Sequence, residues 1–120
     1  MKKLIAFAVP VLPGKTEEWE KFAATLNGEK HEELKAHREQ LEVRERTFLQ
    51  STPNGDTVIV TLEGTDPEAA LEKLGTGKDA FTKWFVKEVK EIHGIDLSAP
   101  MEGFETELVI DSEKLIHELA

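Results

Sequence analysis

Two neighbouring side chains in the charged stretch 29–40 have the chemistry for proton transfer and anion binding. His37 lies one helical turn after Glu33, whose carboxylate can orient the imidazole ring of a catalytic proton acceptor. Arg38 is a candidate ligand-binding residue, because a guanidinium forms paired hydrogen bonds with a carboxylate. The alternatives are a half-buried helix histidine and a surface ion pair between Arg38 and Glu42. The spacing alone leaves both alternatives open.

Residues 43–63 predict a β-hairpin around the turn Thr52-Pro53-Asn54-Gly55. A type I turn with Pro at its second position, followed by a left-handed glycine, gives a three-residue loop. Such a loop pairs Thr52 with Asp56 and determines the rest of the ladder. The predicted partners across the ladder are Arg46 with Leu62, Phe48 with Val60, Gln50 with Val58, Thr47 with Thr61 and Glu45 with Glu63.

The two faces of this hairpin offer different chemistry. Arg46 and Gln50 share one face with Phe48, so they can line a cavity in which Arg46 binds a carboxylate. The alternative is that the charge of Arg46 protects an exposed edge strand. On the other face, Glu45 and Glu63 can share a proton, bind a cation or a basic residue of a partner, or end the ladder in water. The sequence does not decide which face lies toward the helices.

Two further candidates lie on the apolar helix that is predicted to follow Asp79. Trp84 belongs to a stripe of apolar residues with helical spacing, so we expect it in the core, although it can also line a ligand pocket. His93 directly precedes Gly94, where a histidine suits the negative end of the helix dipole. The alternative for His93 is a ligand-binding role.

Composition excludes several classes of protein. A chain of 120 residues without cysteine predicts one domain, 1–120, with no disulfide, thiolate metal site or cysteine nucleophile. His31 and His37 diverge by about 240° around a helix, and no phosphate loop or dinucleotide motif occurs, so we expect no metal and no cofactor. A net charge of −9 argues against nucleic acid and anionic membranes as partners. We expect no membrane span and a cytoplasmic location.

The predicted elements follow the order β-α-β-β-α-β, a ferredoxin-like α+β fold. Strands are expected at 3–9, in the hairpin and at 104–110; helices are expected to start at Thr16, Glu29, Asp66-Pro67 and Lys78-Asp79, with a short terminal helix after Ser112. Right-handed crossovers give one antiparallel sheet with the first and third strands in the middle and helices on one face. The first strand is apolar on both faces, so we expect the uncovered face to meet a second copy in a homodimer.

The stretches TPNGDTVIVTLEGTDPEAALEKL and FTKWFVKEVKEIHGIDL resemble a family of small bacterial proteins in the dimeric α/β-barrel superfamily. The resemblance implies subunits whose sheets pair into a barrel. The superfamily includes monooxygenases, isomerases, stress-responsive barrels and haem proteins, so it implies a fold more strongly than an activity. Its haem proteins commonly carry an axial histidine, which His93 matches by region. Its monooxygenases often use an Asn-Trp-Arg pocket, in which Trp84 matches the tryptophan.

Three hypotheses about function follow. The first is a binding protein that holds a small organic molecule, including an anionic one, between sheet and helices. The second is a cofactor-free monooxygenase or isomerase with His37 as proton acceptor and Arg46 as substrate clamp. The third is haem binding through His93. The enzyme hypothesis requires His37, Arg46 and Trp84 to converge on one pocket.

Overall fold

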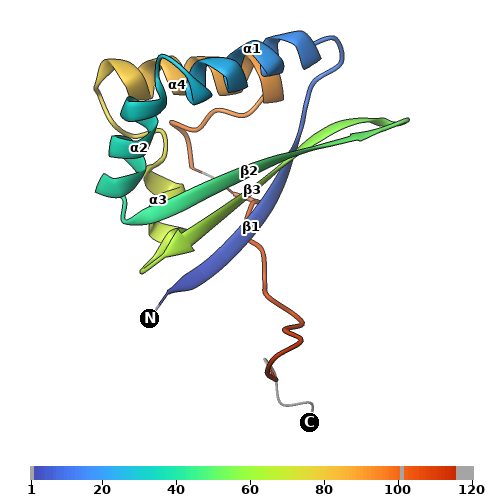
Figure 1. Cartoon of the computed structure of the whole chain (residues 1–120), viewed down its shortest axis with the longest axis vertical. Helices are drawn as coiled ribbons and strands as arrows, with labels where there is room; N and C mark the ends of the chain where they lie inside the picture. Colours follow the sequence, from blue (N-terminus) through green and yellow to red (C-terminus); the bar gives the residue numbers. More distant parts are fainter. Residues whose placement is uncertain (1, 101, 116–120) are drawn as a thin grey trace.

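The predicted hairpin forms one side of an antiparallel sheet with helices packed against it (Figure 1). The structure, a computed structural model, describes residues 2–100 and 102–115. Within these residues the sheet has the order β1-β3-β2, and the class is α+β, as predicted. The elements in chain order are β1 (Lys3–Pro10), α1 (Thr16–Asn27), α2 (His31–Gln40), β2 (Val43–Thr52), β3 (Gly55–Gly64), α3 (Pro67–Lys73) and α4 (Ala80–His93).

Two helix starts follow the predicted local chemistry. The Asp66 side chain accepts a hydrogen bond from the N–H of Ala69 over 3.1 Å, and Asp79 accepts one from the N–H of Thr82 over 3.0 Å. Helix α4 ends at Gly94, whose φ of 74° is a left-handed conformation that glycine adopts easily. Helix α1 begins at Thr16, as predicted, but the Thr16 side chain does not cap it. The hydroxyl donates instead to Asp56 over 2.8 Å and so ties α1 to the hairpin.

The predicted register of the hairpin is wrong by one residue. Thr52 pairs with Gly55 instead of Asp56, so the loop contains only Pro53 and Asn54. Proline is tolerated there because its missing N–H belongs to the turn and not to the ladder. Gly55, with a φ of 123°, is the first residue of β3 and is not a loop residue. A slip of one residue exchanges the faces of one strand relative to the other.

This shift changes the partners of every polar residue on β2. Glu45 lies opposite Leu62, and Arg46 lies opposite Thr61, so the predicted pairing of Glu45 with Glu63 does not form. The residue opposite Glu63 is Arg44.

The predicted fourth strand does not form. Residues 104–110 have no ladder partner among the described residues, and β1 therefore lies at the edge of the sheet rather than in its middle. Phe104 packs edge-on against Phe7 at 6.5 Å between ring centroids, whereas Leu108, Val109 and Ile110 are exposed. The alternating pattern that predicted a strand reports side-chain periodicity, but a strand also needs a neighbouring backbone to bond with. Of the predicted terminal helix, residues 111–114 form a turn, and 116–120 lie outside the described residues.

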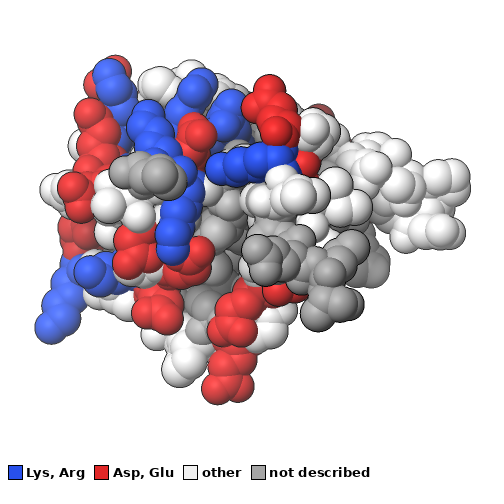
Figure 2. Space-filling model, turned by 90° about the horizontal axis from the view of Figure 1, so that it is seen from below, with Lys and Arg blue, Asp and Glu red and all other residues white. Residues whose placement is uncertain are grey.

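The sheet has one face packed against the helices and one face with exposed side chains. The packed face carries Phe7, Val9, Val58, Val60 and Leu62, all of them buried. Figure 1 shows α1 and α4 side by side over this face, with α2 and α3 at the end of the sheet where β2 begins. In Figure 2 the uncharged tip of the hairpin projects from the molecule, and acidic and basic side chains are mixed over the rest of the visible face. None of the described helices is long and apolar enough to cross a membrane.

Candidate ligand-binding site

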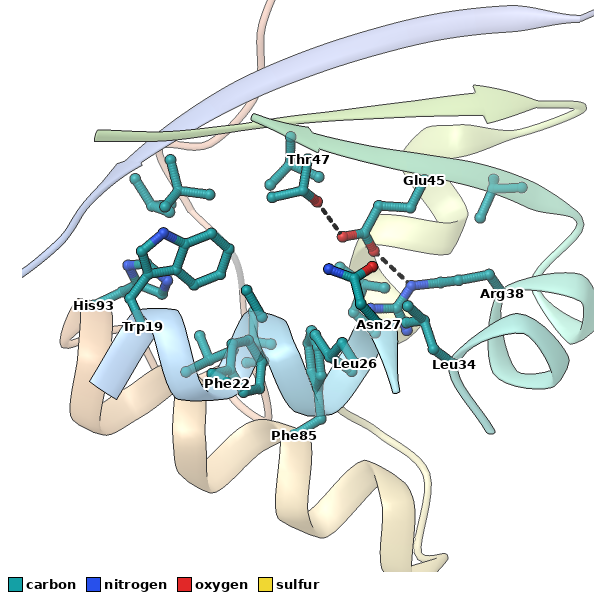
Figure 3. Close-up of a pocket in the computed structure, with 18 of the residues that line it drawn as sticks. Trp19, Phe22, Leu26, Asn27, Leu34, Arg38, Glu45, Thr47, Phe85 and His93 are labelled. Carbon is teal, nitrogen blue, oxygen red and sulfur yellow. Dashed lines mark hydrogen bonds and ion pairs between the residues drawn. The ribbon is translucent and has the colours of Figure 1, made fainter. Parts of the chain in front are cut away.

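A cavity of about 600 Å³ lies between the packed face of the sheet and helices α1, α2 and α4 (Figure 3). This volume falls in the range of natural sites for small organic ligands. Most of the side chains that line its interior are aromatic or aliphatic: Phe7, Val9, Trp19, Phe22, Leu26, Leu34, Val58, Val60, Phe85 and Val89. More polar side chains lie at its edges: Asn27, His31, Lys35, Glu39 and Arg44.

Helical spacing on α1 and α4 explains the aromatic wall. Trp19, Phe22 and Leu26 recur every three or four residues on α1, so they share one face, and this face is turned toward the sheet. Phe85 meets Phe22 from α4 at 5.4 Å between ring centroids, a separation typical of favourable aromatic pairs. The wall is therefore built from two helices that are far apart in the sequence.

One end of the cavity holds a buried ion pair between α2 and β2. Nε of Arg38 donates to Oε1 of Glu45 over 2.6 Å, and the hydroxyl of Thr47 donates to Oε2 of the same carboxylate over 2.6 Å. The two charged side chains retain only 5% and 15% of their exposure. Arg38 also lies over the ring of Phe85, with 4.7 Å from its guanidinium carbon to the ring centroid. The carboxylate is thus held in place by two donors.

The opposite end of the cavity contains His93. Its Nδ1 lies 2.7 Å from the carbonyl oxygen of Pro10. A carbonyl only accepts, so Nδ1 carries the proton and Nε2 carries the lone pair. Burial lowers the pKa of His93 and outweighs the Pro10 hydrogen bond, which acts in the opposite direction. The ring of Trp19 lies beside it, 6.2 Å away between ring centroids.

The structure brings only two of the six predicted site residues, Arg38 and His93, to this cavity. Arg38 does not pair with Glu42, as the alternative interpretation expected, but with Glu45. His93 combines its expected place at the end of a helix with a position in the cavity wall.

The other four predicted residues lie elsewhere. His37 packs against Phe81, and burial lowers its pKa, with the nearby Arg38 as the second cause. Arg46 lies on the exposed face and pairs with Glu63 over 3.5 Å, and Gln50 is exposed on that same face near the hairpin tip. Trp84 is half-buried outside the cavity, under the ammonium of Lys30, which is 5.1 Å from the ring centroid. The convergence of His37, Arg46 and Trp84 that the enzyme hypothesis required is therefore absent.

Sequence reasoning missed Glu45, Thr47 and Trp19 as site residues. Glu45 and Thr47 were assigned to the end of a polar ladder, because the register was off by one residue. In the structure both line the cavity, Glu45 largely buried and Thr47 exposed to solvent at its edge. Trp19 was not among the candidate site residues. The signal that could have found the two polar residues is the unbroken apolar alternation of Val58, Val60 and Leu62, whose face the neighbouring strand must share.

No family model, curated protein or solved structure matches this chain. Membership of the dimeric α/β-barrel superfamily therefore stays a prediction.

Proposed function

We propose that this protein binds a small, largely apolar organic molecule in the cavity between sheet and helices. The observation that carries the proposal is the cavity of about 600 Å³, lined mainly by aromatic and aliphatic side chains, with a few polar groups held in defined positions. Three aromatic rings, those of Trp19, Phe22 and Phe85, suit a flat aromatic body. An anionic ligand is less favoured, because the guanidinium of Arg38 already neutralises Glu45.

A fluorescent apolar probe tests this proposal directly. The chain has two tryptophans, and only Trp19 lines the cavity, so the Trp84→Phe variant reports from the site alone. Binding of 1-aminoanthracene should quench the emission of Trp19 and raise the emission of the probe.

A matched pair of variants identifies where the probe binds. Val60→Phe places a ring in the cavity and should abolish binding, whereas Ile59→Phe makes the same kind of change on the opposite face and should leave binding intact. Equal binding by both variants would show that the probe occupies another surface.

A second candidate is haem binding, which the position of His93 favours. The Nδ1 hydrogen bond to Pro10 fixes the ring and leaves Nε2 as the nitrogen for a metal, an arrangement that is usual for ligating histidines. His93 would hold the iron, and the aromatic wall would enclose the macrocycle. Addition of haemin should produce a Soret band that His93→Phe removes and His37→Phe preserves. Absence of the band from the wild-type protein would reject this candidate.

We also propose that two copies meet through the exposed face of the sheet. Leu4 and Phe48 lie on this face with 51% and 54% of their surface exposed, and Ala6 and Ala8 beside them are also exposed. Apolar side chains gathered on one side of a sheet are typical of an association surface. In a dimer with two-fold symmetry, this patch on one subunit would contact the same patch on the other subunit.

A further inference from the structure

Both ends of the cavity carry polar groups with lone pairs that can accept a hydrogen bond. At the α2 end, Arg38 and Thr47 already donate to Glu45, which leaves lone pairs on the carboxylate and on the threonine hydroxyl oxygen. A ligand carboxylate placed here would face the charge of Glu45, and the one N–H group of Arg38 that lacks a partner, on Nη2, is fully enclosed among the described residues. This end therefore favours a group that donates a hydrogen bond.

The His93 end adds an acceptor next to a donor. Among the described residues, the fully enclosed side-chain polar atom without a partner is Nη2 of Arg38. His93 lines the cavity, and with Nδ1 on the carbonyl of Pro10 its Nε2 lone pair has no hydrogen-bond partner among the described residues. The indole of Trp19 supplies a donor, Nε1–H, from a ring 6.2 Å away.

We propose that the cavity selects neutral hydroxylated aromatic molecules, with the ligand hydroxyl donating to Nε2 of His93 and accepting from Nε1–H of Trp19. This inference rests on the proposed function and specifies its ligand class. A hydroxyl matches the site because it donates and accepts at one atom, whereas a carboxylate has no proton to donate and an ammonium has no lone pair. The aromatic wall holds the ring, and the acceptors at the other end suit a second hydroxyl.

Three ligands of nearly equal size test the proposal: 2-naphthol, naphthalene and 2-naphthoate, each measured by displacement of 1-aminoanthracene from the wild-type protein. One added hydrogen bond predicts that 2-naphthol binds roughly five- to tenfold more tightly than naphthalene. The carboxylate should bind more weakly than both. Equal affinities for 2-naphthol and naphthalene overturn the hydroxyl assignment and leave the proposed function standing. Failure of the probe and of all three ligands to bind overturns the proposed function itself.

A variant assigns the effect to His93. His93→Phe should retain naphthalene binding and lose the advantage of 2-naphthol, whereas His37→Gln, outside the cavity wall, should keep both. If the variant binds 2-naphthol as tightly as the wild type does, His93 is not the acceptor.

The pH dependence of the wild-type protein provides the same test if His93→Phe does not fold. Protonation of His93 converts Nε2 into a donor, and burial lowers its pKa from 6.5, so the advantage of 2-naphthol should fall as the pH decreases below about 6.5. Naphthalene binding should stay constant over this range. The His31→Gln background removes the other histidine of the lining, and the remaining titratable groups there are Lys35, Arg38, Glu39, Arg44 and Glu45. An advantage that does not change with pH contradicts the proposal.

Discussion

The ion pair between Arg38 and Glu45 allows a sharp test of the packed face of the hairpin. Both side chains are largely buried, and the structure joins them over 2.6 Å. We consider three variants: Arg38→Met, Glu45→Leu and the double substitution. Each single substitution leaves one charge buried without its partner, whereas the double substitution replaces the pair with apolar side chains of similar size.

The expected magnitudes follow from burial. Removal of one member of a buried pair costs about 3–5 kcal/mol, and because Glu45 keeps 15% exposure we expect the lower end, about 3 kcal/mol for each single variant. The double variant should lie within about 1 kcal/mol of the wild-type protein. With a urea slope of about 2 kcal/mol/M, each single variant should lower the unfolding midpoint by about 1.5 M.

Urea unfolding followed by circular dichroism measures these values, and the hairpin contains its own control. Arg46 and Glu63 form the same type of pair on the exposed face, over 3.5 Å, with side-chain exposures of 44% and 33%. Arg46→Met and Glu63→Leu should each cost less than about 1 kcal/mol, as exposed pairs do. If the two buried substitutions are additive, or cost no more than the exposed ones, Arg38 and Glu45 are not a buried pair and the register described above is wrong.

Three further predictions concern stability and assembly. Gly64→Ala should lower the free energy of unfolding by about 1–3 kcal/mol in urea titrations, because a Cβ there meets the carbonyl oxygen of Glu42, between α2 and β2. The pKa values of His37 and His93 are lowered in the folded state, so the unfolded chain binds more protons below about pH 6.5. Thermal stability should therefore fall as the pH decreases through that value. His93→Phe should make the melting temperature less dependent on pH. Sedimentation should show a dimer that Phe48→Glu dissociates and Gln50→Glu does not; a wild-type monomer at micromolar concentration would contradict the proposed association.

Much of the local structure was predictable from the sequence. The starts of α3 and α4 were signalled by Asp66, which precedes Pro67, and by Asp79, and the end of α4 was signalled by Gly94. These signals act within one helical turn. The helix-covered antiparallel sheet also followed from periodicity. Periodicity also predicted a strand at 104–110 that does not form. A strand depends on a partner backbone, which the spacing of side chains does not report.

The site depended on contacts between distant residues, which local patterns do not encode. Arg38 and His93 were identified as candidates by residue type. The sequence did not predict that Arg38 pairs with Glu45 or that His93 bonds to the carbonyl of Pro10. His37 had equally suitable chemistry and lies outside the cavity wall.

The sequence by itself determined where the helices begin, which faces of them are apolar and that the hairpin turns at Pro53 and Asn54, because these features depend on neighbours along the chain. Only the tertiary structure decided the register. Loops of two and three residues differ little in local energy, but they turn opposite faces of β2 toward the helices. That choice places Glu45 and Thr47 in the cavity wall and Arg46 outside it. It was made by the packing of Val58, Val60 and Leu62 against helices from both ends of the chain.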